Sequence, residues 1–371
     1  MKFTILKNKI EPIVEFLSLY IDASDSFMPF RCLFFNINSD FLTITAQSAT
    51  ISARKKIDIE QNNINLEEVG KVLINASILK NIIKKFNKYV TFKVNENSID
   101  IYEGTTKFTL TKIDIHQYPQ IDFNNQDNRT EVNSAQLEKT INNASIAASI
   151  SNDKLNALVY KCINVSSDGA NSIRFVSTDS YRLSTESIKV SKPVEINLTI
   201  DARNLKRIVT KDADRKVFMF FNQGKFGISY TDTVVQTLTT NLNYMDIWNL
   251  FNFDVSRTIK IEKQEFLKLI SKALFYSSEK SRRLQFTFNQ NEVKVVYEVP
   301  EIGIGEAQTS NYTLEGPNIE IDLDFQYIKD AISVLENGII NIFISKKEDR
   351  LLLISENNNY NKQLITPLRR I

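Results

Sequence analysis

The sequence predicts an α+β fold made of three copies of one unit. Two kinds of helical segment each recur three times along its 371 residues. Between them lie groups of short runs that alternate apolar and polar residues, as strands with one buried face do. Because the strands come in groups rather than singly between helices, we expect mostly antiparallel sheets.

The first kind of helix opens each unit. In the segment 7–17 the apolar residues follow i, i+3, i+4 and i+7 spacing, and they are Ile10, Ile13, Val14 and Leu17. This spacing is typical of an amphipathic helix. Similar segments begin at Ser134 and Lys263. Ser134 lies 126 residues after Asn8, and Lys263 lies 129 residues after Ser134. A period of this length indicates repeated domains rather than a solenoid.

The second kind of helix begins after Asn75, Asp201 and Asp324, at offsets of 126 and 123 residues. A short side-chain oxygen at these positions accepts hydrogen bonds from the unpaired N–H groups of a helix start. We therefore predict helices over 75–88, 201–212 and 324–337. In the middle one, Leu205, Ile208 and Val209 form the expected core stripe.

Strands are predicted where polar and apolar residues alternate. The clearest runs are 41–46, 90–94, 172–176 and 285–288. Polar stretches such as 124–128 separate the units, so we predict domains at 1–124, 125–252 and 253–371. Each contains roughly 120 residues, enough to build a core of its own.

Composition limits the class of protein. The chain carries 46 basic and 44 acidic residues, a net charge of +2, so binding to nucleic acid would require the charges to be segregated in space. The N-terminus does not resemble a signal peptide, and no run of 18 apolar residues occurs. With only two cysteines, Cys32 and Cys162, a disulfide framework is excluded and a cytoplasmic location is expected.

Few residues are suited to catalysis. His116 is the only histidine, and it precedes a proline in a turn-like stretch, which favours an ordinary loop residue. Neither GxGxxG nor GxxxxGK[ST] occurs, so the common phosphate-binding loops are missing. We expect no catalytic, metal or cofactor site. An enzyme that uses carboxylates alone remains an improbable alternative.

Several segments together resemble the bacterial sliding clamp, the β subunit of DNA polymerase III. The segment 176–183, VSTDSYRL, matches the V-A-T-D-G-H-R-L motif of that family, and the opening 1–5, MKFTI, matches its first strand. Residues 155–157, 244–246 and 366–371 resemble its L-N-G, F-P-D-Y and M-P-M-R-L segments. The departures are Ser180, Tyr181, Met245 and the additional Arg370.

The resemblance implies three clamp domains per chain, and a head-to-tail homodimer whose six domains form a ring around duplex DNA. It also implies a pocket that binds peptides of the polymerase III catalytic subunit, the clamp loader and other partners. The pocket maps to Leu155, Thr178, Ser180, Tyr181, Arg182, Leu183, Met245, Asn249, Leu250, Tyr327, Leu364, Thr366, Pro367, Leu368 and Arg369.

The same resemblance assigns two further surfaces. The residues expected to contact DNA phosphates are Lys80, Lys84, Arg203, Lys206 and Arg207. The residues expected at the dimer interface are Ile82, Lys107, Phe108, Leu110, Phe275 and Tyr276. The leading prediction is a non-catalytic processivity factor that slides on DNA. The alternative is a stand-alone peptide-binding module whose DNA role is secondary or lost.

Overall fold

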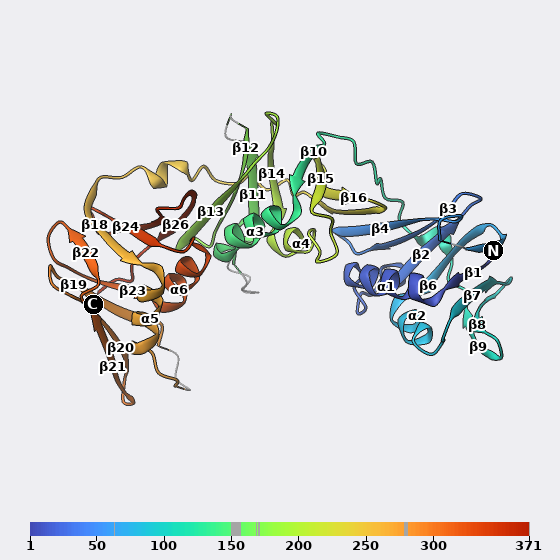
Figure 1. Ribbon diagram of the computed structural model, residues 1–371, viewed down its shortest axis with the longest axis horizontal. Helices are drawn as coiled ribbons and strands as arrows, with labels where there is room; N and C mark the ends of the chain where they lie inside the picture. The colour runs from blue at the N-terminus through green and yellow to red at the C-terminus, as the bar shows by residue number, and fades with distance from the viewer. Residues whose placement is uncertain (63, 150–156, 168, 170, 278–280, 371) are drawn as a thin grey trace. The chain divides into compact units, whose positions relative to one another are not determined.

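The computed structural model describes residues 1–62, 64–149, 157–167, 169, 171–277 and 281–370. The chain divides into two compact units, which are coloured by residue number in Figure 1. The first contains residues 1–134 and 207–239, and the second contains residues 135–206 and 240–371. Each unit combines helices with antiparallel sheets, so the predicted α+β class is confirmed.

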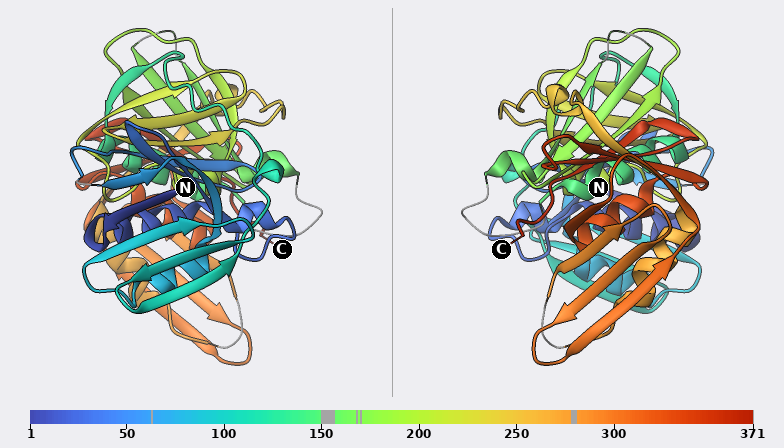
Figure 2. Two further views of the ribbon diagram at one scale, coloured as in Figure 1. Left: turned by 90° about the vertical axis from the view of Figure 1, so that its right-hand side faces the viewer. Right: turned by 90° about the vertical axis from the view of Figure 1, so that its left-hand side faces the viewer.

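The first unit contains a five-stranded antiparallel sheet in the order β5-β1-β7-β8-β9. Its strands are β1 (Lys2–Leu6), β5 (Asn65–Glu68), β7 (Tyr89–Val94), β8 (Ser98–Glu103) and β9 (Thr106–Thr111). The left view of Figure 2 shows β7, β8 and β9 side by side in cyan. β9 therefore lies at the edge of its sheet.

The same unit contains an eight-stranded sheet in the order β10-β15-β16-β17-β4-β3-β2-β6. Its strands are β2 (Cys32–Ile37), β3 (Phe41–Gln47), β4 (Ile51–Asp58), β6 (Gly70–Asn75), β10 (Thr130–Asn133), β15 (Lys216–Phe221), β16 (Lys225–Tyr230) and β17 (Thr233–Leu238). The pairing of β17 with β4 joins strands that are far apart in the sequence into one sheet. We call this pairing, with the β3–β4 turn beside it, the first junction.

Two helices pack on one face of these sheets. They are α1 (Lys7–Leu17) and α2 (Ala76–Ile83), and short 3-10 turns lie at η1 (Ser18–Tyr20), η2 (Met28–Arg31) and η3 (Ile115–Gln117). Ile10, Val14 and Leu17 of α1 are buried, as the predicted amphipathic spacing requires. The apolar stripe of the helix thus faces the core and its polar face is left to solvent.

The second unit contains a nine-stranded sheet in the order β14-β11-β12-β13-β26-β25-β24-β18-β22. Its strands are β11 (Cys162–Ser167), β12 (Ser172–Thr178), β13 (Arg182–Lys189), β14 (Asn197–Asp201), β18 (Val255–Glu262), β22 (Tyr312–Glu315), β24 (Ile339–Ser345), β25 (Leu351–Ser355) and β26 (Asn358–Ile365). The pairing of β13 with β26, with the β12–β13 turn, is the second junction. It repeats the connection that β4 and β17 make in the first unit.

A four-stranded sheet completes the second unit in the order β21-β20-β19-β23. Its strands are β19 (Arg283–Phe288), β20 (Val293–Val299), β21 (Gly303–Thr309) and β23 (Ile319–Asp324). β21 forms an edge, and its hairpin with β20 is drawn in orange in Figure 2. The helices of this unit are α3 (Ser134–Ala144), α4 (Ala202–Lys206), α5 (Lys263–Ala273) and α6 (Phe325–Val334), and its 3-10 turns are η4 (Ser145–Ala147), η5 (Leu158–Lys161) and η6 (Trp248–Phe251).

The predicted helix caps are confirmed. Asn75 accepts the N–H of Ile78 at 3.1 Å, and Asp324 accepts the N–H of Gln326 at 2.8 Å. Asp201 likewise accepts the N–H of Arg203 at 2.9 Å. The four predicted strand runs also lie within β3, β7, β12 and β19. Capping and alternation therefore located these elements correctly.

All three helices of the second kind are shorter than predicted, and α6 ends at Val334 rather than at 337. α2 ends at Ile83, because the Glu103 carboxylate accepts the backbone N–H groups of Asn87 and Lys88 at 2.6 and 2.7 Å and draws the chain into a turn. α4 ends at Lys206 rather than continuing to 212. The residues that follow it include the β-branched Ile208, Val209 and Thr210, which have lower helix propensity.

Among the described residues, no helix is both long enough and apolar enough to span a membrane.

Candidate functional site

The β12–β13 turn at the second junction is held in one conformation by its own polar groups. The Thr178 hydroxyl donates to the Arg182 carbonyl at 2.7 Å, and the Ser180 N–H donates to the Thr178 hydroxyl at 3.1 Å. The Asp179 carboxylate accepts the N–H of Tyr181 at 3.1 Å. Ser180 has a φ of 78°, a backbone region that glycine adopts without strain. The motif that this segment resembles has a glycine at this position.

Arg182 connects this turn to α6. Its guanidinium contacts the Asp179 carboxylate at 3.1 Å and the Asp330 carboxylate at 2.6 Å, and it lies 4.3 Å from the centre of the Tyr327 ring. A guanidinium with two carboxylate partners and an aromatic face is fixed in orientation. Arg182 and Tyr327, which were predicted to share a site, are therefore in contact.

The segment before β18 covers the end of the same sheet. Apolar side chains pack here in one buried cluster, which contains Val176, Leu183, Ile247, Leu352 and Leu364. Trp248 packs against this cluster, and the Arg174 guanidinium lies 4.1 Å from the centre of its ring. The carbonyl of Leu250 accepts a hydrogen bond from Arg350 at 3.2 Å. Cationic side chains thus hold the segment against the sheet.

The C-terminal tail crosses from β26 toward β23. The Thr366 N–H donates to the Tyr181 carbonyl at 2.9 Å, and the Leu368 N–H donates to the Asp322 carbonyl at 2.8 Å. Arg283 donates to the Arg369 carbonyl at 3.0 Å. Because the tail bonds both to the β12–β13 turn and to β23, it forms one wall of the second junction.

The structure brings most of the predicted pocket residues together within the second unit. Tyr181 is 62 % exposed, Met245 is 42 % exposed and Leu250 is 41 % exposed, so three large side chains with apolar surface face solvent. Leu183 and Leu364, in contrast, are buried in the core cluster and form the floor rather than an open surface. Leu155 lies outside the described residues.

Sequence reasoning missed three contributors to this site. Trp248 and Phe251 supply much of the apolar cover, and Asp330 fixes Arg182. Two signals for them existed. The aromatic residues follow the segment 244–246 that resembles a family motif, and the predicted helix 324–337 carries more acidic than basic residues.

The basic residues predicted to contact DNA differ in how free they are. The Arg203 side chain is 79 % exposed, and its ion pair with Asp201 is long at 3.6 Å. Lys84 pairs with Glu15 at 3.5 Å where both side chains are well exposed. Arg207 lies beyond the end of α4, donates a hydrogen bond to the Leu19 carbonyl and lies 5.7 Å from the centre of the Tyr20 ring.

Lys206 and Lys80 complete this set. Lys206 is the last residue of α4 and borders a small cavity of about 90 Å³ that Arg203 and Lys161 also line. Lys80 lies in the last turn of α2 and is half-buried. Cations in the last turn of a helix interact favourably with its dipole, so both positions also suit a purely structural role.

The predicted dimer residues are partly available. Phe108 and Leu110 lie on one face of the edge strand β9 and are half-buried, while Tyr276 is 97 % exposed. Phe275 packs against Tyr297 with ring centres 5.2 Å apart. Ile82 is only 5 % exposed and belongs to the core.

Lys107, the remaining residue of that set, forms an ion pair with Asp100 at 2.9 Å. The Thr109 hydroxyl also donates to this carboxylate, at 2.7 Å. Hydrogen bonds first from Thr109 and then from Lys107 lower the pKa of Asp100 to about 2. Lys107 is thus already engaged within the chain.

Other reactive groups are poorly placed for chemistry. Burial raises the pKa of the Cys32 and Cys162 thiols to about 11, so neither forms a nucleophilic thiolate readily. Within the part of the chain that the structure describes, no group of three or more histidine, cysteine or acidic residues is arranged to hold a metal ion.

Three family models match consecutive parts of the chain. The DNA polymerase III beta subunit N-terminal domain matches residues 1–122, the central domain of that subunit matches residues 131–246, and its C-terminal domain matches residues 250–369. Together they cover nearly the whole sequence.

Relatives and solved structures agree with these matches. A "Beta sliding clamp" of Mycoplasmopsis pulmonis is 25 % identical over 378 residues and covers 100 % of both chains. One of Staphylococcus epidermidis is 24 % identical and covers 87 % of this chain and 86 % of the relative. The DNA polymerase sliding clamp of Bacillus subtilis is similar in structure, with a TM-score of 0.92, 20 % identity and full coverage of both chains.

Proposed function

The chain belongs to the DNA polymerase III beta subunit family, and we propose that two copies of it close into a six-domain ring around duplex DNA. It is a DNA sliding clamp and not an enzyme, because this family is a non-catalytic processivity factor. The observation that carries this conclusion is the run of three consecutive family domains along one chain. The alternative of a stand-alone peptide-binding module is not favoured.

The ring's partners follow from the same function. They are duplex DNA without sequence preference, a second copy of the chain, the DNA polymerase III catalytic subunit, the clamp loader and other proteins that carry clamp-binding peptides. We propose a cytoplasmic location, since bacterial DNA is replicated there. The three domains are proposed to span 1–124, 125–252 and 253–371, each with its own pair of helices.

The second junction is the proposed peptide pocket. Exposed Tyr181, Met245 and Leu250 offer an apolar surface beside the polar and rigid Arg182. This combination suits a short peptide with apolar and aromatic anchors, because a few desolvated anchors supply most binding energy. Since Arg182 is already paired with Asp179 and Asp330, its proposed role is to hold Tyr327 and the turn in place rather than to bind a free carboxylate.

The proposed DNA contacts are the basic residues near the ends of the second helices. Exposed ion pairs such as Lys84 with Glu15 contribute little energy, so their cations can exchange a carboxylate for a phosphate. Contacts to phosphates alone carry no base code and therefore permit sliding. The full set is Lys80, Lys84, Arg203, Lys206 and Arg207.

A salt titration tests these contacts. The Lys206→Ala/Arg207→Ala double variant should bind duplex DNA more weakly on unrelated sequences. Its plot of log affinity against log salt should flatten by about 1.8, or about 0.9 for each lost phosphate contact. The control is Lys93→Ala/Lys346→Ala, which removes two exposed lysines outside the helices. An unchanged slope in the first variant would remove these two residues from the DNA surface.

The proposed dimer contact uses two sheet edges. β9 in the first domain and β21 in the third are both edge strands, whose free N–H and C=O groups can pair with another chain. Phe108 and Leu110 present an apolar face beside β9, and Tyr276 is nearly fully exposed. We therefore propose that the first domain of one protomer packs on the third domain of its partner.

Light scattering tests this dimer. One chain has a mass of 42.7 kDa. The unsubstituted protein should have twice this mass in solution, and the Phe108→Asp/Tyr276→Asp double variant should have the mass of one chain. Tyr276→Asp alone is included because this exposed side chain does not contribute to the packing of the monomer. The control is Tyr181→Asp, an exposed tyrosine outside the interface, which should stay dimeric. A double variant that remains a dimer would disprove the contact.

A further inference from the structure

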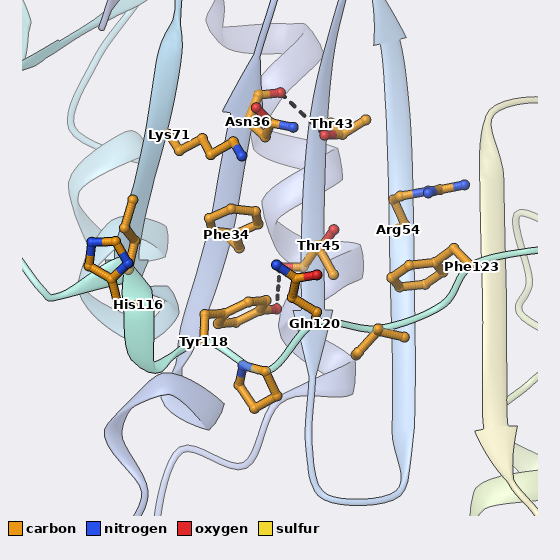
Figure 3. A pocket seen from close by; sticks show the side chains of 13 residues that line it. Phe34, Asn36, Thr43, Thr45, Arg54, Lys71, His116, Tyr118, Gln120 and Phe123 are labelled. Carbon is orange, nitrogen blue, oxygen red and sulfur yellow. Dashed lines mark hydrogen bonds between the residues drawn. The ribbon is translucent and has the colours of Figure 1, made fainter.

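A second recess lies in the first unit, on the sheet face opposite α1 and α2. Figure 3 shows it from close by, with strands β2, β3, β4 and β6 as its floor and the segment that leads away from η3 across its rim. The cavity has a volume of about 520 Å³, which is within the range of small-ligand sites. None of its lining residues belongs to the peptide pocket, the DNA contacts or the dimer contact proposed above.

The recess has a cation on each of its outer strands, and aromatic rings lie beside them. Lys71 extends from β6 toward β2, beside Phe34, and Arg54 extends from β4 with its guanidinium 4.6 Å from the centre of the Phe123 ring. The Tyr118 ring stacks on Phe34 with the ring centres 4.9 Å apart. Since β4 and β6 are separated by two strands, the backbones that carry the cations lie about 14 Å apart.

The cations of this recess make no direct contact with a carboxylate of the described residues. Among the residues that the structure describes, neither Arg54 nor Lys71 forms a hydrogen bond or an ion pair through its side chain. The lining contains no aspartate or glutamate. Asp122 is near enough for its charge to act on Arg54, but its direct ion pair is with Lys225 at 2.8 Å. Asp114 accepts the N–H of His116 at 2.9 Å.

The pattern continues along the same sheet face. Lys56 lies two residues beyond Arg54 on β4, and its ammonium is 4.2 Å from the centre of the Phe41 ring. Hydroxyl and amide groups line the floor between the cations, and they belong to Asn36, Thr43, Thr45 and Gln120. Unpaired cations that alternate with aromatic rings are typical of surfaces that bind single strands, where phosphates meet the charges and bases stack on the rings.

We propose that this recess binds a short stretch of single-stranded nucleic acid. The backbones of Arg54 and Lys71 lie farther apart than the width of one phosphate group. A strand that spans the recess can therefore place a different phosphate near each of the two cations. The bases would contact the Phe34, Tyr118 and Phe123 rings, and sequence preference would be weak because every base has a stacking face. The site is separate from the helices that are proposed to contact duplex DNA.

The probe is a fluorescein-labelled thymidylate hexamer, titrated by anisotropy at several salt concentrations. Lys71→Gln should weaken binding about fivefold and flatten the salt slope by about 0.7, the value for one phosphate contact of a single strand. Lys71 is exposed, so this substitution leaves the core intact. Arg54→Gln should act in the same direction. The control Lys93→Gln, an exposed lysine on β7, should change neither value.

Photocrosslinking locates the bound strand. A hexamer with 5-iodouracil should crosslink to the peptides that contain Phe34 or Tyr118, and should still do so in the Lys206→Ala/Arg207→Ala variant. The proposal is overturned if crosslinks occur only in other segments, or if Lys71→Gln binds as tightly as the unsubstituted chain. Thymidine monophosphate that binds as tightly as the hexamer would also overturn it, because a single nucleotide would then suffice.

Discussion

The two junctions share a scaffold but present different chemistry. In the first, Gln47 pairs with Ser52 at the end of the β3–β4 hairpin; in the second, Thr178 pairs with Leu183 at the end of the β12–β13 hairpin. The neighbouring strands also correspond, since β17 places Thr237 opposite Ile51 and β26 places Ile365 opposite Arg182. The positions of Ile51 and Arg182 are therefore equivalent.

At the first junction hydrogen bonds and an ion pair hold the crossing segment 119–123 against the sheet. Gln236 donates to the Asp122 carbonyl at 2.9 Å, Lys225 pairs with the Asp122 carboxylate at 2.8 Å, and Gln47 donates to the Pro119 carbonyl at 3.2 Å. A cavity of about 420 Å³ lies beside these contacts, and Leu238 is exposed there. At the second junction the exposed large side chains are Tyr181, Met245 and Leu250. The comparison teaches that the repeated fold supplies a turn and a crossing segment at both places, while a few side chains decide which chemical groups each junction presents.

The largest expected effect is a loss of peptide affinity when the second junction alone is disrupted. Deletion of 367–371 removes the wall that hydrogen-bonds to β23. Binding of a clamp-binding peptide should fall at least about 100-fold, equivalent to about 2.7 kcal/mol. Fluorescence anisotropy measures the affinity, and light scattering checks that the dimer persists. A truncated chain that binds as tightly as the full chain would refute the pocket assignment.

A matched pair of substitutions sharpens the comparison. Tyr181 and Thr50 hold equivalent turn positions at the two junctions, one residue before Arg182 and Ile51. Tyr181→Asp should weaken peptide binding about tenfold, because it replaces an exposed ring by a charge that must be desolvated. Thr50→Asp should leave peptide affinity unchanged. Equal losses in the two variants would mean that the junctions do not differ in function.

The smallest expected effect is a change in the free energy of unfolding caused by Asp100, which lies at neither junction. Hydrogen bonds from Thr109 and Lys107 hold the pKa of Asp100 at about 2, below its ordinary value near 4. Their stabilisation is present above pH 4 and is lost as the pH falls from about 4 toward 2. Asp100→Asn should lower the free energy of unfolding by about 1 kcal/mol at pH 7.

Urea unfolding measures this difference, and peptide affinity should not change. The gap between Asp100→Asn and the unsubstituted chain should narrow at pH 3. A gap that is as large at pH 3 as at pH 7 would show that the carboxylate charge is not what stabilises this sheet.

Much of the fold was predictable because its signals are local. Caps at Asn75, Asp201 and Asp324 and the spacing of Ile10, Val14 and Leu17 depend only on neighbouring residues. The ends of α2, α4 and α6 were predicted wrongly. The carboxylate that ends α2 comes from Glu103, which is distant in the sequence, so no local pattern contains it.

The candidate site was only partly predictable. The segment 176–183 identified the turn, because its residues cap and brace one another within eight positions. The pairing of Arg182 with Asp330 joins residues 148 positions apart, and the burial of Leu183 and Leu364 depends on Trp248 and Phe251 packing over them. Such contacts come from tertiary packing, which periodicity does not encode.

Hydrogen–deuterium exchange on the full dimer, with and without a clamp-binding peptide, tests the difference between the junctions most directly. The account predicts slower exchange in 178–183, 244–250 and 366–369, and no change in 47–52 and 119–123. Protection of the first junction, or equal protection of both, would contradict the assignment of peptide binding to the second junction.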